Sequence, residues 1–286
     1  VIILRNQFLK VFLFFKKSLA KQIIKDAWPM AFSATLGIFM LNTDIIMLGW
    51  WRTAEEIGYY SVSQRIVKLL YTLPALLAVG IFPTLSRLIK QNEKQKAKNL
   101  SEKIMTLIFL MAIPLVIGGV ILGQPIIELI FGQEYLPAVP AFQILIISLL
   151  VIFSGPLLFN LVLAHNQQKR IVKYVAAGAL GNVIFNAILI PIYGIIGAAI
   201  TTIVAYSLYY GLTWRKIKKT ADLKILPYLK KITAAAIIMG VFTFTLNQFG
   251  LNVIINIIIS AVIYLGALYL LKEKILEEVM SLFKKI

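Results

Sequence analysis

The sequence contains no cysteine, a single histidine and very little charge. Without cysteine the chain can form neither a disulfide nor a thiolate-bound zinc site, and it has no thiol nucleophile. Only 14% of its residues are charged, against roughly a quarter in soluble domains, whereas 60% are hydrophobic. A soluble core cannot bury that much apolar surface. These proportions therefore exclude a soluble enzyme and indicate a membrane protein.

Patterns that would carry catalysis are missing as well. The chain has no Walker loop, no HExxH segment, no Ser/His/Asp set and no acidic pair near a membrane face for glycosyl transfer. The loops between its apolar segments are too short to build a catalytic domain. We therefore expect a protein that is not an enzyme, with no cofactor and no bound metal, although coupling to a proton or sodium gradient is compatible with the sequence.

Eight apolar stretches are long enough to cross a bilayer, which takes about 20 residues. Unbroken runs such as LIFLMAIPLVIGGVIL predict helices rather than the alternating strands of a barrel. The sequence therefore predicts an all-α integral membrane protein of about eight transmembrane helices. The expected spans are Trp28–Trp50, Tyr59–Leu85, Ile104–Leu122, Pro140–Ala164, Tyr174–Ile190, Ile195–Trp214, Ile232–Phe249 and Val253–Leu271.

Lysine and arginine outnumber aspartate and glutamate by 29 to 12, which gives a net charge of +17. Of these basic residues, 26 lie in alternate loops or at the termini, on one side of the predicted membrane. The positive-inside rule then makes both termini cytoplasmic, in a multi-pass protein of the inner cell membrane. The charge is a topology signal and an attraction for anionic membrane lipids, so no nucleic-acid partner is needed to explain it.

The chain divides into three parts by its pattern. Residues 1–27 mix apolar side chains with spaced lysines and arginines, which predicts a cytoplasmic or interfacial segment or the remnant of a preceding helix. Residues 28–214 hold six predicted spans. Residues 215–286 hold two additional spans and a cytoplasmic tail.

Three charged residues lie well inside the predicted spans: Asp44, Arg65 and Lys68. Charge in this position is costly and by default indicates a function. Asp44 and Arg65 have nearly the same depth on two helices joined by a short loop, so one interpretation is a salt bridge that fixes helix packing. The other is a water-filled cavity where Arg65 and Lys68 bind an anionic group such as phosphate and Asp44 couples to a cation. Lys68 has no acidic partner at its depth, which favours the second interpretation.

Prolines and asparagines also interrupt the spans. Pro74, Pro114 and Pro156 each remove a helical hydrogen bond and permit either a static bend or a hinge. Asn182 and Asn186 stand one turn apart on the fifth span, where they either join helices or contact a substrate.

The run GNVIFNAILIPIYGIIGAAITTIVAY resembles the signature of polysaccharide-export flippases in the MATE-like, or MOP, superfamily. Two further stretches agree in kind and order, NTDIIMLGWWRTAEEIGYYSVSQRIVKLLYTLPALLAVGIFPTLSRL and IFGQEYLPAVPAFQILIISLL. The resemblance implies a transporter that moves polyprenyl-diphosphate-linked oligosaccharide from the cytoplasmic to the outer leaflet by alternating access. It also implies that Arg65 and Lys68 hold the diphosphate in a central cavity and that Asp44 occupies the family's acidic position.

Transporters of this family have two facing lobes and more spans than the eight predicted here. The motifs resemble the second lobe followed by two trailing helices, so the resemblance predicts a fragment of a full flippase that lacks the first lobe. The expected partners are the lipid-linked oligosaccharide, membrane lipids and a polysaccharide polymerase or export complex.

Other functions stay open from the residues. A MATE-type cation-coupled exporter of drugs or small molecules is the nearest alternative, although its cavity would be rich in acids and aromatic residues. A membrane glycosyltransferase or polymerase would need longer outer loops and paired acids. A membrane scaffold without transport activity is the remaining alternative.

Overall fold

The computed structural model describes residues 16–273, and every regular element in that range is a helix. The predicted all-α membrane fold is thereby confirmed. The first helix begins at Lys17, so it includes the end of the segment 1–27, whose first 15 residues lie outside the described range. In chain order the elements are α2 (Lys17–Trp51), α3 (Ala54–Leu70), α4 (Thr72–Lys90), α5 (Lys94–Ile121), α6 (Gly123–Phe131), the short 3-10 helix η1 (Gln133–Ala138), α7 (Val139–Ile147), α8 (Leu149–Ile152), α9 (Gly155–Ala164), α10 (Gln168–Ala221), α11 (Leu226–Gln248) and α12 (Val253–Leu270).

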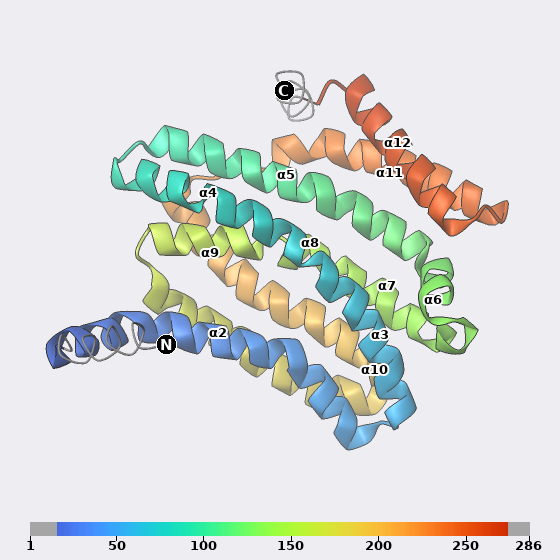
Figure 1. Cartoon of the computed structure of the whole chain (residues 1–286), viewed down its shortest axis with the longest axis horizontal. Coiled ribbons are helices and arrows are strands. Elements are labelled where there is room, and N and C mark those ends of the chain that lie inside the picture. Colours follow the sequence, from blue (N-terminus) through green and yellow to red (C-terminus); the bar gives the residue numbers. More distant parts are fainter. Residues whose placement is uncertain (1–15, 274–286) are drawn as a thin grey trace, which may run out of the picture.

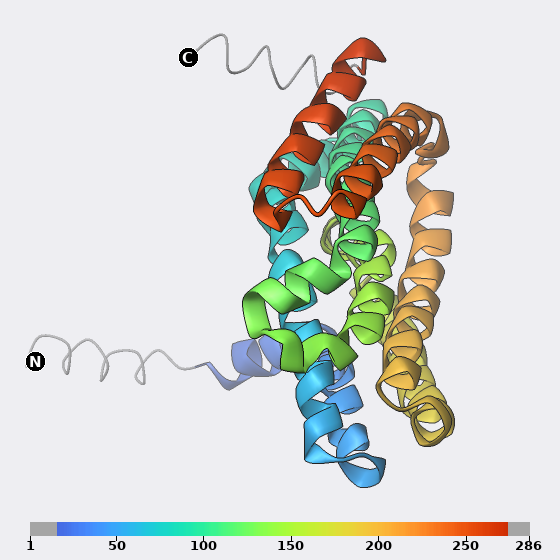
Figure 2. The same ribbon diagram turned by 90° about the vertical axis from the view of Figure 1, so that its right-hand side faces the viewer.

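Gly194 turns the long helix α10 into a hairpin of two arms. Its φ of 57° and ψ of −133° lie where a residue with a Cβ is strained. Beyond the turn the arms touch so closely that a Cβ on Gly197 would lie 2.2 Å from the Leu189 carbonyl oxygen. Figure 2 shows the two arms side by side, joined by a tight turn. Glycines at such positions let the two backbones approach.

The hairpin reconciles the predicted number of spans with the observed helices. Seven helical stretches within residues 16–273 are long and apolar enough to cross a membrane. Because α10 folds back at Gly194, it accounts for two of the predicted spans, and the described chain has the eight expected crossings. The predicted domain boundary after residue 214 falls inside the second arm of α10, which continues to Ala221.

Two spans are interrupted where the helix breaks. The second span breaks at Tyr71, between α3 and α4, and Pro74 stands in the first turn of α4. The fourth span breaks on both sides of α8, and Pro156 stands in the first turn of α9 after the second break. Pro114, by contrast, lies within α5, which is continuous. Two of the three singled-out prolines therefore coincide with breaks, and their use as hinges stays a prediction.

The helix α5 separates the main bundle from the last two helices (Figure 1). On one side, α2 packs along α10. On the other, α11 and α12 pack on each other and α11 packs on α5. A neutral network joins this last pair: the hydroxyl oxygens of Thr243 and Ser260 are 2.7 Å apart, and Asn256 Nδ2 donates to the Thr243 carbonyl oxygen at 3.1 Å.

Large apolar side chains cover the outside of the bundle, and polar ones lie within it. Val79 is 74% exposed and Phe249 is 83% exposed. Asp44, Asn182 and Asn186 are buried with 1% exposure or less. This distribution suits a bilayer, where apolar side chains face lipid and polar groups must be satisfied inside the protein.

The helix ends and connectors that are rich in lysine and arginine gather at one end of the bundle. The loops after α4 and α9, the connector Asp222–Ile225 after α10 and the start of α2 share this end in Figure 1. A salt bridge of 2.7 Å between Lys98 near the start of α5 and Asp222 joins two of these segments. We call this end the basic end and the opposite one the far end.

Candidate functional site

A buried carboxylate, Asp44 on α2, lies at the centre of the main bundle with 1% of its surface exposed. Four neutral groups donate hydrogen bonds to it. The hydroxyls of Tyr60 and Thr202 donate to Oδ2, each at 2.7 Å. The amides of Asn182 and Asn186 donate to Oδ1 at 3.1 and 2.8 Å. The charge of Asp44 is therefore stabilised by oriented dipoles rather than by a cation.

The four donors come from three segments that are distant in sequence. Tyr60 lies on α3, the two asparagines on the first arm of α10, and Thr202 on the second arm. Asn182 and Asn186 are four residues apart and therefore face the same side of the helix, which lets both amides reach one oxygen. We call Asp44, Tyr60, Asn182, Asn186 and Thr202 the Asp44 cluster.

The predicted salt bridge between Asp44 and Arg65 does not form. Arg65 is exposed and, within residues 16–273, makes no hydrogen bond or ion pair. The two residues lie at a similar depth, as a pair would require. However, the rotation of α3 about its own axis turns Arg65 away from Asp44. The buried face of α3 contains Tyr60, Ser63 and Val67, and Arg65 projects from another side of the helix.

The basic pair Arg65 and Lys68 instead forms a cationic patch on the outside of the described chain. Lys68 is half-buried, and its Nζ lies 3.5 Å from Asn42 Oδ1 on α2. The surroundings are apolar, because Ile38 on α2 is 63% exposed and Leu69 on α3 is 70% exposed. Two positive charges thus lie within a transmembrane stretch, on an apolar surface. The nearby acid Asp44 is buried inside the bundle.

The far end of the bundle is held by Arg52, which the sequence analysis did not single out. Its Nη2 donates to the carbonyl oxygens of Ile190 and Pro191 at 2.7 and 2.8 Å, at the tip of the α10 hairpin. The same guanidinium lies 3.9 Å from the carboxylate of Glu56 in the first turn of α3. Arg52 therefore fixes α10 to the turn between α2 and α3, and this keeps the donors of the Asp44 cluster in register.

One acceptor of the Asp44 cluster has no partner. Asn186 Oδ1 is buried without a hydrogen bond, although its amide nitrogen donates to Asp44 and to Asn182 Oδ1. The buried cluster thus contains carboxylate, amide and hydroxyl oxygens, the ligand types that hard cations prefer, although Asn186 turns its amide nitrogen towards Asp44. No group of three or more His, Cys, Asp or Glu residues suited to a metal occurs within residues 16–273.

Two members of the cluster, Tyr60 and Thr202, were missed from the sequence. Both lie in the stretches that carry the family resemblance, Tyr60 in IGYY and Thr202 in GAAITT. Because these side chains are neutral, the search for charged residues within the spans did not find them. Asp44, Asn182 and Asn186 were all singled out, and the structure brings these three together.

The chain matches known proteins in sequence. Residues 3–140 match the family described as polysaccharide biosynthesis protein. A probable flippase of Haloferax volcanii is 27% identical over 253 residues, covering 85% of this chain and 52% of the relative. An uncharacterised membrane protein of Methanocaldococcus jannaschii is 28% identical, over 73% of this chain and 41% of that protein. A putative O-antigen transporter of Shigella flexneri is 24% identical, over 52% and 35%. The chain thus spans about half the length of these relatives or less.

Solved structures with the same fold are transporters. An outward-facing multidrug resistance MATE-family transporter of the MOP superfamily matches with a TM-score of 0.62 at 15% identity, over 86% of this chain and 64% of the other. A MOP superfamily transporter from Pyrococcus furiosus matches with a TM-score of 0.60 over the same shares. In sequence the chain is similar to the polysaccharide biosynthesis protein family and to proteins named as flippases, and in fold it is similar to solved transporters of the MOP superfamily.

Proposed function

We propose that this chain forms part of a membrane transporter that flips polyprenyl-diphosphate-linked oligosaccharide, such as an O-antigen, capsule or exopolysaccharide repeat unit, from the cytoplasmic to the outer leaflet. The names of the relatives from Haloferax and Shigella support a flippase of glycan precursors. In this proposal, the lobe with its two trailing helices acts together with a further lobe. A transporter of this kind has no catalytic step, in keeping with the residues.

The cationic patch of Arg65 and Lys68 is the observation that carries this proposal. Unpaired charge at membrane depth is expensive unless it faces a water-filled cavity or an oppositely charged ligand. A diphosphate suits the patch, because a guanidinium binds two phosphate oxygens at once and the neighbouring ammonium adds a point charge. The patch would then face the other lobe of the transporter across a central cavity.

An apolar cavity beside the patch suits the lipid part of the same substrate. It has a volume of about 540 Å³ and lies between the α3–α4 segment, α5, α11 and α12. Ile66 and Leu70 line it from the same turns of α3 that carry Arg65 and Lys68. In this proposal the diphosphate binds at the patch while part of the polyprenyl chain lies in the apolar cavity.

Energy for transport would come from an ion gradient acting through the Asp44 cluster. The buried carboxylate and the unpaired Asn186 Oδ1 offer a place for a proton or a sodium ion. Exchanging Asp44→Asn removes the charge but keeps one carbonyl oxygen. We expect transport by this variant to lose its dependence on pH or sodium, measured in vesicles with an imposed gradient. Unchanged dependence on both ions would exclude this role.

The proposed setting is the inner cell membrane, with both termini on the cytoplasmic side and a polysaccharide polymerase or export complex as a partner. The gathering of basic loops at one end supports this orientation by the positive-inside rule. Attachment of a membrane-impermeant thiol reagent to cysteines introduced singly at Lys94 and Asn252 would test it. The first should react from the cytoplasmic side and the second from the outside.

The decisive experiment exchanges both basic residues in the full-length protein. We expect Arg65→Ala with Lys68→Ala to leave complete lipid-linked repeat units in the cytoplasmic leaflet and to deplete surface polysaccharide. The matched control, Lys216→Ala with Lys219→Ala, removes the same charge outside the membrane and should transport normally. Wild-type levels of surface polysaccharide in the first variant, at equal protein level, would exclude the proposed site.

A cation-coupled exporter of drugs or small molecules is the alternative, and the buried acid Asp44 in a MATE-like fold favours it. Such an exporter would change drug susceptibility when its gene is deleted and would leave surface polysaccharide unchanged. A flippase would show the reverse.

A further inference from the structure

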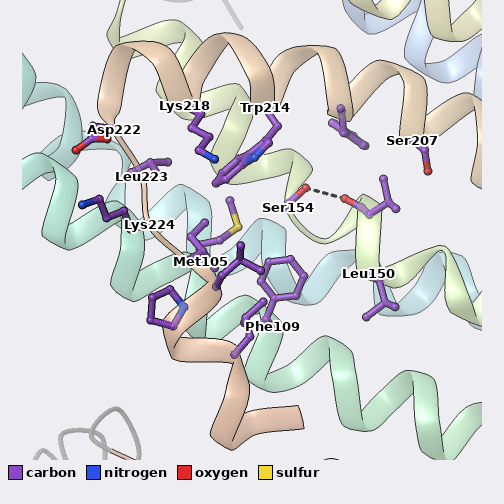
Figure 3. A pocket seen from close by; sticks show the side chains of 17 residues that line it. Met105, Phe109, Leu150, Ser154, Ser207, Trp214, Lys218, Asp222, Leu223 and Lys224 are labelled. Carbon is purple, nitrogen blue, oxygen red and sulfur yellow. Dashed lines mark hydrogen bonds between the residues drawn. The ribbon is translucent and has the colours of Figure 1, made fainter.

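A second cavity, of about 740 Å³, opens at the basic end of the bundle (Figure 3). Its walls come from α5, from the break between α8 and α9, from the second arm of α10, and from the connector and first turn of α11. Neither the Asp44 cluster nor the Arg65–Lys68 patch lines it. Its volume is within the range of ligand-binding pockets, and the proposed function does not use it.

The interior of this cavity is apolar. Met105 and Phe109 line it from α5, Leu150 from α8, and Leu229 from α11. Ser154 stands in the same wall, but its hydroxyl donates to the Val151 carbonyl oxygen at 2.7 Å and is thereby satisfied locally (Figure 3). The deep part of the cavity therefore offers apolar contact and few polar partners, as an acyl chain requires.

The mouth of the cavity is basic. Lys218 on α10 and Lys224 on the connector both line it, and Trp214 lies one turn before Lys218. In Figure 3 the ammonium of Lys218 points towards the cavity beside Trp214, whereas that of Lys224 points away from it. Neither ammonium group makes a hydrogen bond within the described residues. Tryptophan is typical of the layer where lipid headgroups meet the hydrocarbon. The mouth is thus placed at headgroup level, with the apolar interior beneath it.

The acids nearest to the mouth are already engaged. Within residues 16–273, Asp222 is the one acidic residue that lines the cavity. Its Oδ2 accepts a hydrogen bond from Lys98 at 2.7 Å. Glu102, buried on α5, accepts from the backbone N–H of Lys224 at 2.7 Å. These contacts fix the connector on α5. Asp222 also attracts Lys218 and Lys224, but neither ammonium group forms a hydrogen bond to it, so both can donate to a ligand.

We propose that this cavity binds one anionic phospholipid of the bilayer, with the phosphate between Lys218 and Lys224 and an acyl chain along Phe109 and Leu150. Basic pockets between transmembrane helices on the cytoplasmic side select anionic headgroups. A soluble anion would gain nothing from the apolar wall, and a zwitterionic lipid brings no net charge to the two lysines. Because the walls belong to both α10 and α11, the bound lipid joins the trailing helices to the main bundle.

The first test compares two lipids with identical acyl chains, phosphatidylglycerol and phosphatidylcholine, added to the delipidated full-length protein in detergent. We expect native mass spectrometry to show preferential binding of one phosphatidylglycerol and thermal unfolding to shift upward with that lipid. Exchanging Lys218→Gln with Lys224→Gln should weaken this binding roughly tenfold. The control variant, Lys216→Gln with Lys219→Gln, removes the same charge from the same helix outside the cavity and should bind normally.

A second variant blocks the apolar part and keeps both lysines. Gly211 lines the cavity, and a Cβ built on it meets no atom within 4 Å, so the side chain of Gly211→Leu begins in open space. We expect this variant to lose phosphatidylglycerol binding while remaining folded, since leucine favours a helix. Gly266→Leu, at an equally open position on α12 outside the cavity, is its matched control.

Four results would overturn the proposal. Equal binding of phosphatidylcholine would make the site a purely apolar one. An identical thermal shift with inorganic phosphate alone would make it a site for a soluble anion. Displacement of phosphatidylglycerol by an equimolar polyprenyl diphosphate would assign the cavity to the transported lipid instead. Retention of binding in both the double-lysine variant and Gly211→Leu would place the lipid elsewhere on the protein.

Discussion

The helix α3 presents two kinds of polar group within the membrane, and they differ in every respect but depth. One side of α3 carries Tyr60 into the Asp44 cluster, where an acid is buried and accepts four hydrogen bonds. Another side carries Arg65, which is exposed and makes no hydrogen bond or ion pair in the described part of the chain. Within a few residues, the same helix thus carries a side chain of the buried, hydrogen-bonded Asp44 cluster and an exposed side chain of the cationic patch.

This difference separates polar groups that hold the fold from those available to a ligand. A buried group that is fully paired contributes to stability, and its removal leaves its partners unpaired. An exposed charge in a membrane contributes nothing to packing and is unfavourable until something neutralises it. Stability and transport should therefore respond in opposite ways to mutations in the two regions, which the following measurements examine.

The largest effect should follow Asp44→Ala, which leaves four buried donors without an acceptor. We expect the free energy of unfolding to fall by on the order of 3 kcal/mol. Thermal unfolding in detergent, followed by the loss of helical circular dichroism, measures it. Asp44→Asn keeps one oxygen and should lose clearly less. If both variants unfold at the wild-type temperature, the cluster does not hold the bundle together.

The next effect should follow Gly194→Ala, because the turn of α10 carries Thr202 back towards Asp44. Alanine is strained at a φ of 57° and ψ of −133°, and its Cβ would lie 3.2 Å from Glu56 Oε1. We expect a loss of about 1–3 kcal/mol in the same unfolding measurement. Gly80→Ala is the control, since it lies within helix α4 with no atom within 4 Å of the new Cβ and should be neutral or slightly stabilising. An equal response of the two variants would contradict the strained turn.

A smaller effect on stability should come from the salt bridge between Lys98 and Asp222 at the basic end, because Asp222 is exposed to solvent. The hydrogen bond from Lys98 lowers the pKa of Asp222 below its ordinary value of 3.8. A lowered carboxylate pKa contributes stability above the ordinary value and loses it as the pH falls through the lowered pKa of the folded protein. Asp222→Asn should therefore destabilise slightly at pH 6 and not at pH 2, by thermal unfolding. The control Asp26→Asn removes a carboxylate that makes no hydrogen bond or ion pair within residues 16–273, and it should leave the unfolding temperature at pH 6 unchanged.

The smallest effect on stability should follow Arg65→Gln with Lys68→Gln. Arg65 is exposed, and half-buried Lys68 makes only a long hydrogen bond of 3.5 Å to Asn42, so we expect the free energy of unfolding to change by no more than about 0.5 kcal/mol. Thermal unfolding of this variant should match the wild type, whereas Asp44→Ala does not. A loss as large as that of Asp44→Ala would mean that the patch serves the fold and would remove the contrast between the two regions.

The sequence by itself determined the class of the fold and the number of crossings. The length of each apolar run is compared directly with the thickness of a bilayer, so eight crossings follow without knowledge of any contact. Asp44, Asn182 and Asn186 also stood out, because polar residues are rare in such runs and each needs a partner.

The tertiary structure alone decided which of these groups meet. Sequence fixes how deep a residue lies along a helix, but not how that helix is rotated about its axis, and the rotation of α3 turns Tyr60 rather than Arg65 towards Asp44. Thr202 reaches the same carboxylate because α10 reverses at Gly194 and Arg52 holds its tip. The side chains of Tyr60 and Thr202 are neutral, so nothing in the sequence indicates that they bind a carboxylate. They meet at Asp44 because of helix packing, which many small contacts across the whole bundle determine.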